Sequence, residues 1–389
     1  MSRAILSIGA GVEQLESIKI AEELGFKVIA VDGDTEAVGF GYASVSHCVD
    51  IKDENVVIQV ARDYGVDFVL PAPIGNLLTV VGAVNDAIGL RGISNAAARA
   101  CTNKATCNNL LKDAGVPVAQ QWRVSGAAEL YEVLEKATLP VIVKPNKGSG
   151  SRGVRLISTM ADLPDIEDGD WLIETFIEGR EFGVDAVLFS DVFECALIRD
   201  KDITTPPYRQ ELGYTVPTSV DENTRSKILE TVEKAARVLK FSDCLINADV
   251  IVTAEGDVYL LEIAGRASGN LISTQMVPAA CSRDYLKEAI LLMAKGGKPR
   301  PFEIVRPITL KFIDCSEGTV LKCKKLPTSD TEAGMLAGVC SLQPGNILNA
   351  ISSTADVFMR GWVMTTGATT GEARELASNI IQKMEIEVV

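Results

Sequence analysis

Apolar residues in the first 95 positions fall into short continuous runs separated by segments with helical spacing. Short β-branched runs predict buried strands, and apolar residues three or four positions apart predict amphipathic helices. On this basis strands are expected at 4–8, 27–31 and 68–70, and helices at 13–24 and 56–64. Strands that alternate with helices are typical of a parallel sheet with crossover helices. We therefore predict an α/β layer at the start of the chain.

The rest of the chain mixes strand and helix patterns. Helices are predicted at 96–113, 222–239 and 371–384, and strands at 141–143 and 171–173. Residues 198–217 lose regular patterning and contain three prolines, so they are expected to form a polar loop. With 389 residues and 47% hydrophobic content, the chain can bury more than one core, and two or three domains are expected.

Charge and cysteine content narrow the class of protein. The formal net charge of −14 disfavours nucleic acid and anionic membrane surfaces as partners. The nine cysteines are scattered without a Cys-x-x-Cys pair, which predicts reduced, mostly buried thiols in a cytoplasmic protein. No signal peptide or membrane-spanning run is recognisable. The only histidine, His47, is expected to be structural.

The stretch Pro140-Val-Ile-Val-Lys-Pro-Asn-Lys-Gly-Ser-Gly-Ser-Arg-Gly-Val154 carries the first chemical signal. A buried strand ends in Lys144 and opens into a loop with three glycines and further cations. Glycines tolerate positive φ and let backbone N–H groups approach an anion, so this loop is suited to nucleotide phosphates. The spacing of a Walker A loop is absent. A Gly/Ser hairpin loop remains the alternative for this segment taken alone.

A second signal lies in two β-runs around the turn Glu255-Gly256. If that turn centres a hairpin, Ala254 faces Asp257, and Asp249 faces Glu262. Two carboxylates opposite each other on one sheet face lie roughly 5 Å apart and repel, unless a divalent cation such as Mg²⁺ lies between them. The alternatives are an edge hairpin with both carboxylates in solvent, and a bulge that shifts the register.

Together with the segment Trp171-Leu-Ile-Glu174-Thr-Phe-Ile-Glu-Gly-Arg-Glu181, these signals resemble the ATP-grasp superfamily of ligases. The elements that carry the resemblance, in family order, are Lys104, Lys144, the glycine loop, Glu174 and Glu181, Asp249, and Glu262-x-x-x-Arg266. The resemblance covers the whole chain. It implies an ATP-grasp fold of α/β and α+β class with three domains. These are a Rossmann-like pre-ATP-grasp domain at 1–95, an ATP-grasp domain at 96–300 with a mobile lid at about 116–177, and a small C-terminal α+β domain at 301–389.

The resemblance also implies roles for particular residues. The ATP-binding set is expected to be Lys104, Lys144, Lys147, Gly148, Ser149, Gly150, Ser151, Gly153, Val154, Glu174, Phe176, Ile177 and Glu181. Catalytic roles fall to Arg266, Lys144 and Lys201, and the metal ligands are Asp249 and Glu262. Gly9, Gly11 and Glu13 are expected near the acceptor substrate. The Gly9-x-Gly11 pair with Asp32 also invites a dinucleotide-binding interpretation, but Gln14 stands where that fingerprint has its third glycine.

One further loop narrows the resemblance to ATP-grasp L-amino-acid ligases. Their motif Pro-Pro-x-x-x-Glu-x-Gly-His-x-x-Pro is matched by Pro206-Pro207…Glu211-Leu-Gly213-Tyr214-Thr-Val-Pro217. The resemblance implies that Glu211 holds a substrate amino group, with Tyr214, Arg266, Gly269 and Asn270 also at the substrate. Tyr214 replaces the motif histidine, which leaves the substrate open. Ala264 stands where the family most often has asparagine, which leaves open whether one or two metal ions bind; Asn247 or Asn270 could supply an oxygen.

The expected activity is therefore an ATP-dependent carboxylate–amine ligase that acts through an acyl phosphate. ATP and Mg²⁺, with Mn²⁺ as an alternative, are the expected cosubstrate and metal. Amino acids are the expected partners, and a homodimer is common among similar proteins. Two alternatives stay open: a carboxylase that loads bicarbonate onto an aminoimidazole ribonucleotide, and an NAD-linked or non-catalytic nucleotide-binding protein. The sequence after residue 300 contains no recognisable catalytic or binding motif, so we expect that segment to serve packing or oligomer formation.

Overall fold

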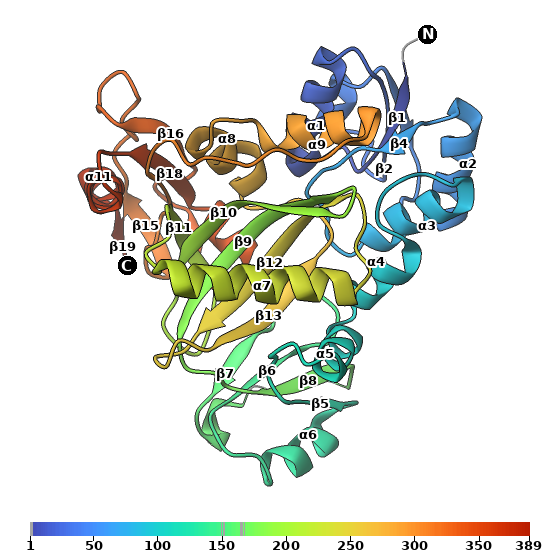
Figure 1. Cartoon of the computed structure of the whole chain (residues 1–389). Helices are drawn as coiled ribbons and strands as arrows, with labels where there is room; N and C mark the ends of the chain where they lie inside the picture. Colours follow the sequence, from blue (N-terminus) through green and yellow to red (C-terminus); the bar gives the residue numbers. More distant parts are fainter. Residues whose placement is uncertain (1–2, 149, 151, 164–165, 167) are drawn as a thin grey trace.

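The computed structural model describes residues 3–148, 150, 152–163, 166 and 168–389 (Figure 1). The chain begins with a parallel four-stranded sheet in the order β3-β2-β1-β4. Its strands are β1 (Ala4–Ile8), β2 (Lys27–Asp32), β3 (Val45–Cys48) and β4 (Phe68–Val69). The crossover helices are α1 (Val12–Glu23) and α2 (Glu54–Tyr64), and α3 (Leu78–Ile88) follows β4. The predicted α/β layer is confirmed, although β3 was not predicted.

His47 lies on β3, the strand that the pattern missed. Its Nε2 atom lies 2.9 Å from the Tyr64 hydroxyl at the end of α2. The His47 ring thus connects β3 to α2 through a hydrogen bond, consistent with the expected structural role.

The helix predicted at 96–113 is two helices, α4 (Asn95–Thr102) and α5 (Lys104–Asp113). Asn103 separates them because its backbone is extended, and its side chain accepts a hydrogen bond from the Thr106 N–H. A side chain that satisfies a free backbone donor starts a new helix. As a result Lys104 is the first residue of α5, at the end that faces the glycine loop.

A second four-stranded sheet, with order β5-β8-β6-β7, carries the glycine loop. It consists of β5 (Gln121–Val124), β6 (Val141–Pro145), β7 (Arg155–Ile157) and β8 (Trp171–Thr175), and α6 (Ala127–Leu134) packs on it. Both Lys144 and Glu174 lie within strands, each one residue beyond the strands predicted at 141–143 and 171–173. In Figure 1 this layer lies apart from the first sheet, beneath the central one.

An eight-stranded central sheet runs in the order β13-β12-β9-β10-β11-β14-β18-β16. Its strands before residue 300 are β9 (Arg180–Phe189), β10 (Val192–Ile203), β11 (Glu211–Val216), β12 (Cys244–Val252) and β13 (Val258–Ala264). One face packs on α7 (Glu222–Val238), α4 and α5, and the other on α9 (Tyr285–Lys295) and the first layer. The short helices η3 (Ile272–Met276) and α8 (Val277–Ala280) precede α9.

The prediction of a polar loop over 198–217 is wrong. β10 extends to Ile203 and β11 begins at Glu211, so only 204–210 lies outside strands. The two strands pair directly, with Lys201 opposite Tyr214. Their polar residues line a cleft rather than solvent, which is why the apolar pattern fails there.

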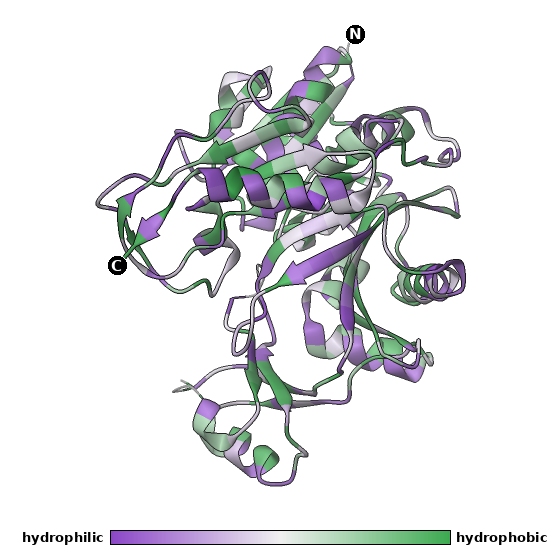
Figure 2. Cartoon of the chain, turned by 90° about the vertical axis from the view of Figure 1, so that its left-hand side faces the viewer, coloured by the Kyte–Doolittle hydropathy of each residue, from purple (hydrophilic) through white to green (hydrophobic). Residues whose placement is uncertain are grey.

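After residue 300 three strands extend the same central sheet: β14 (Ile308–Phe312), β16 (Met335–Cys340) and β18 (Gly361–Thr366). α10 (Thr354–Phe358) and α11 (Thr370–Lys383) accompany them. A small sheet, β17-β15-β19, joins Ile347–Leu348, Gly318–Lys322 and Glu387–Val388. Figure 2 shows purple and green bands alternating along the helices, as expected for helices with one face on a core. The division into three domains stays a prediction.

Candidate active site

A cleft of about 960 Å³ lies between the glycine-loop sheet and the central sheet; we call it the nucleotide cleft. The predicted residues that line it are Lys104, Lys144, Gly148, Gly150, Val154, Glu174, Phe176, Ile177, Glu181, Lys201, Glu211, Asp249 and Glu262. Lys147 and Gly153 do not line it, and Ser149 and Ser151 lie outside the described residues. The structure therefore brings most of the predicted set to one place, although the elements that carry it lie far apart in sequence.

Two predicted lysines lie beside the glycine loop in the nucleotide cleft. The Lys144 Nζ atom lies 2.6 Å from Glu174 Oε2, and both side chains are only 11% exposed. Lys104 donates to the Gly148 carbonyl over 2.9 Å. An anion held by the loop would therefore lie close to the Lys104 ammonium group. Gly150 has φ +69°, a backbone conformation that glycine adopts at little cost.

Lys201 lies at the centre of three carboxylates. Its Nζ atom is 3.0 Å from Glu211, 3.1 Å from Asp249 and 3.6 Å from Glu181, and the lysine side chain is 4% exposed. Burial lowers the pKa of Lys201, but these three carboxylates together raise it well above its ordinary value. Lys201 is therefore a permanent cation that binds Glu181, Glu211 and Asp249 together.

Replacing Lys201 with methionine is expected to destabilise the fold by about 3–5 kcal/mol at neutral pH, because three carboxylates then lose their shared buried cation. Lowering the pH should recover part of this loss, since protons neutralise the carboxylates. Urea unfolding at pH 7.5 and 5.5 measures both effects, and Lys201→Arg is the control that keeps the charge. Equal stability of Lys201→Met and the parent chain at pH 7.5 would contradict the cluster.

The hairpin of β12 and β13 places Asp249 opposite Glu262, as predicted. The turn itself differs, because Thr253 rather than Ala254 bonds Asp257. A register shift between Asp249 and Val250 restores the expected pairing, with one additional residue on β13. The sequence analysis expected a bulge to prevent this pairing. In the structure the bulge is what brings the two carboxylates opposite each other.

The donor set of this pair fits a hard divalent cation. Asp249 Oδ1 is buried and has no hydrogen-bond partner within the described parts of the chain, whereas Oδ2 lies 3.1 Å from Lys201. Glu262 is exposed beside it. Within the described residues, no group of three or more His, Cys, Asp or Glu side chains is arranged to hold a metal. Two carboxylates that leave the other positions to phosphate and water are typical of Mg²⁺ with a nucleotide.

The amide oxygen of Asn247, considered as a further ligand, is already engaged. It accepts from Arg199 over 3.2 Å and from Ser268 over 2.8 Å. Arg199 also pairs with Asp185, and both are buried. Burial raises the pKa of Asp185, an effect that Arg199 opposes. This network lies beside Asp249, and apart from Asn247 the sequence assigned its residues no role.

A second space of about 1180 Å³ adjoins the nucleotide cleft; we call it the acceptor chamber. The two spaces share Gly150, Arg152, Glu211, Asp249 and Glu262. Asp249 and Glu262 therefore lie at their junction. The other lining residues of the acceptor chamber include Glu13, Gln14, Pro73, Gly75, Arg199, Tyr214, Arg266, Gly269 and Asn270.

All predicted substrate residues line this chamber. Tyr214 is 1% exposed and accepts a hydrogen bond from Asn270 over 3.0 Å, so its hydroxyl is fixed. The Arg266 guanidinium donates to the Ala267 carbonyl over 2.8 Å, and none of the ion pairs among the described residues joins it to Glu262. Burial raises the pKa of Glu13, while the Asn270 N–H and Arg266 lower it.

The C-terminal segment, for which the sequence indicated only packing, also reaches the acceptor chamber. Ser353, Thr354 and Ala355 line it. The Thr354 N–H donates to the Gly150 carbonyl over 3.3 Å, so the segment contacts the glycine loop directly. Arg152 and Arg209 are further lining cations that sequence analysis missed, and Arg209 donates to Glu181 over 3.1 Å. Only their position next to motif residues could have identified them.

Comparison with known proteins identifies the class. Residues 137–275 match the ATP-grasp domain family, so the chain carries an ATP-grasp domain. The solved L-amino acid ligase of Bacillus licheniformis superposes with a TM-score of 0.83 at 18% identity, covering 100% of this chain and 99% of that one. At that identity the match shows the shared fold, and it confirms the ATP-grasp fold predicted from sequence.

Two curated relatives extend the comparison. The L-arginine-specific L-amino acid ligase of Bacillus subtilis is 23% identical over 320 residues, 78% of this chain and 76% of that protein. A D-alanine–D-alanine ligase of Flavobacterium johnsoniae is 26% identical over 201 residues, 47% of this chain. The match spans only 62% of the latter's length. Among the described helices, none is both long and apolar enough to cross a membrane.

Proposed function

We propose that this chain is an ATP-dependent ligase that joins an amino acid, or a similar small carboxylic acid, to an amine. The observation that carries the proposal is the charge pattern of the acceptor chamber. Arg266 and Glu211 both line it, and it opens at Asp249 and Glu262 onto the nucleotide cleft. A guanidinium for a carboxylate and a carboxylate for an ammonium suit the two charges of an amino acid.

The nucleotide cleft supplies what phosphoryl transfer needs, which is mainly position and compensating charge. Lys104, Lys144 and the glycine loop would hold the phosphates. Glu181 would hold the ribose hydroxyls, and the backbone near Glu174 to Ile177 would read the adenine edge. Glu181 accepts a hydrogen bond from Arg209, so ribose hydroxyls would share this carboxylate with the guanidinium.

Asp249 and Glu262 would hold Mg²⁺, which screens the charge of the phosphate oxygens when it is bound. The reaction then proceeds in two steps. A substrate carboxylate oxygen attacks the γ-phosphate and ADP leaves, giving an acyl phosphate. The amine nitrogen attacks the acyl carbon, phosphate leaves, and the amine loses its extra proton. Arg266 would hold the carboxylate and afterwards the oxyanion of the tetrahedral intermediate.

The first-layer lining of the chamber supports this proposal over an aminoimidazole ribonucleotide carboxylase. That substrate carries a phosphate, yet the residues of the first layer that line the chamber include the acidic Glu13 and no described lysine or arginine. Such carboxylases also have alanine at the position of Ala264. This shared residue is why the carboxylase remains the second candidate function.

ADP release with a panel of amino acids tests the proposal. Release that depends on particular amino acids is expected. Dependence on bicarbonate together with aminoimidazole ribonucleotide would establish the carboxylase instead. Nucleotide binding without release under any condition would overturn both enzymatic assignments and leave a binding protein.

Replacing Glu211 with alanine is expected to raise KM for the amino acid roughly tenfold or more and to change KM for ATP far less. The reason is that a charge-assisted hydrogen bond to the ammonium is lost, while the phosphate contacts remain. Initial rates of ADP release at varied amino acid and varied ATP measure the two constants. Equal increases in both would remove Glu211 from the ammonium site. Glu230→Ala, at an exposed position of α7, is the control.

A further inference from the structure

Arg152 of the glycine loop lies where the two spaces of the candidate active site meet. Among the described residues it is the one cation that lines both the nucleotide cleft and the acceptor chamber. Arg152 is also exposed, so a ligand in either space can reach it. No contact proposed for the ligase reaction uses the Arg152 side chain.

The backbone of the glycine loop keeps Arg152 at this place. The next residue, Gly153, has φ +76°, and a Cβ atom there would lie 3.1 Å from Pro145 Cγ. A larger residue at position 153 would therefore be strained and crowded. With glycine, the chain returns closely against the end of β6 directly after Arg152. Arg152 is thus held near the end of the strand that carries Lys144.

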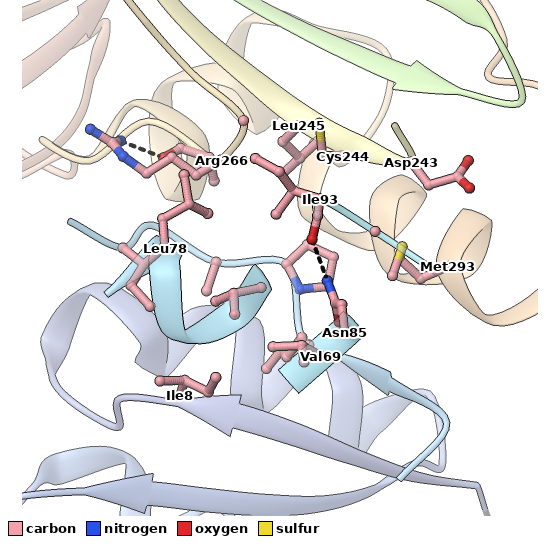
Figure 3. Close-up of a pocket in the computed structure, with 18 residues that line it drawn as sticks. Ile8, Val69, Leu78, Asn85, Ile93, Asp243, Cys244, Leu245, Arg266 and Met293 are labelled. Atoms are coloured by element: carbon pink, nitrogen blue, oxygen red, sulfur yellow. Dashed lines mark hydrogen bonds between the residues drawn. The ribbon is translucent and has the colours of Figure 1, made fainter. Parts of the chain in front are cut away.

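The other six cations that line the two spaces are already engaged by the protein. Carbonyl or carboxylate oxygens bind Lys104, Lys144, Lys201, Arg199 and Arg209, as described above. Arg266 donates to the Ala267 carbonyl over 2.8 Å, the bond drawn beside it in Figure 3. Arg152, in contrast, has no hydrogen bond, ion pair or ring contact within the described parts of the chain. Its guanidinium is therefore available to an anionic ligand.

The carboxylates at the junction do not engage Arg152 either. Glu211, Asp249 and Glu262 line the same two spaces. Glu211 and Asp249 pair instead with Lys201, at 3.0 and 3.1 Å. An anionic group at the junction would give Arg152 the partner that the described residues do not provide. In the proposed reaction, the anionic group that crosses this junction is the phosphoryl group.

We infer that Arg152 is a catalytic residue that holds the phosphoryl group as it moves from ATP to the substrate carboxylate, a role that rests on the proposed ligase function. The bond from the γ-phosphorus to the ADP oxygen breaks, the bond to the carboxylate oxygen forms, and the guanidinium stays protonated throughout. A planar guanidinium binds two phosphoryl oxygens at once, and phosphoryl transfer needs mainly position and compensating charge from a protein. When the amine displaces phosphate in the second step, Arg152 holds the departing phosphate.

Replacing Arg152 with methionine is expected to lower kcat for ADP release about 100-fold or more. Affinity for MgADP should change less than about threefold, because ADP lacks the transferred group. Arg152→Lys keeps the charge without the planar pair of donors, so its rate should be intermediate. Arg300→Met, at another exposed arginine, is the control and should keep the parent rate. A rate for Arg152→Met within a few-fold of the parent chain would overturn the catalytic role.

A second measurement uses no turnover and separates this role from the ligase function. Aluminium fluoride with MgADP mimics the phosphoryl group in transfer, and such mimics bind more tightly than the ground state. We expect aluminium fluoride to tighten ADP binding about tenfold or more in the parent chain and less than about threefold in Arg152→Met, measured by titration. Equal tightening in both would overturn the role of Arg152 and leave the ligase function intact. No tightening in the parent chain would also overturn this role, while ADP release with the amino acid panel decides on the ligase function separately.

Discussion

Replacing Arg266 with lysine is expected to lower kcat about 100-fold or more, while nucleotide affinity changes little. Arg266 lines the acceptor chamber and not the nucleotide cleft, so its loss should affect the acyl centre rather than ATP. A lysine keeps the charge but lacks the planar pair of donors that suits a carboxylate, and loss of an oxyanion donor commonly costs that much in rate.

Steady-state rates of ADP release and nucleotide binding by titration separate these two effects. Arg306→Lys is a matched control, because Arg306 is exposed and its Nε atom also donates to a backbone carbonyl, that of Ala279. A rate for Arg266→Lys within a few-fold of the parent chain would show that the guanidinium only supports the local backbone.

Replacing Glu262 with glutamine is expected to reduce turnover roughly 1,000-fold without loss of fold, since the contribution of a bound metal is several kcal/mol. Glutamine has nearly the same shape, but its neutral amide is a poor ligand for a hard cation. The exposed position of Glu262 predicts that the change costs little stability.

The metal contribution has a readout of its own. Nucleotide-dependent binding of Mn²⁺ should weaken in Glu262→Gln, together with the rate. Glu255→Gln, in the exposed turn of the same hairpin, should change neither property. Full activity of Glu262→Gln would remove this carboxylate from the metal site.

The parts of the fold that sequence could predict are those in which one face of each element is buried in an apolar core. Strands β1, β2 and β4 of the first layer and helix α7 are of this kind, and their periodicity predicted them to within a residue or two. The strand β10 was missed because Arg199 and Lys201 face a polar site instead of a core. Where a functional surface replaces the core, hydrophobic alternation no longer reports the strand.

The candidate site shows the same limit. The predicted hairpin around Glu255-Gly256 placed Asp249 opposite Glu262, but the sequence did not predict that a bulge would be needed to achieve this pairing. Thr354 and Arg209 carry no motif of their own and reach the two spaces only through tertiary packing.

The continuity of the eight-stranded sheet has a consequence for any attempt to shorten the protein. β11, which carries Glu211 and Tyr214, is hydrogen-bonded on one side to β14. A chain cut near residue 300 would therefore lack β14, the neighbour of a strand that lines the candidate active site. The backbone N–H and C=O groups of β11 that β14 normally pairs would then be exposed and could pair with another chain. We therefore expect such a fragment to self-associate and its Glu211 to be displaced.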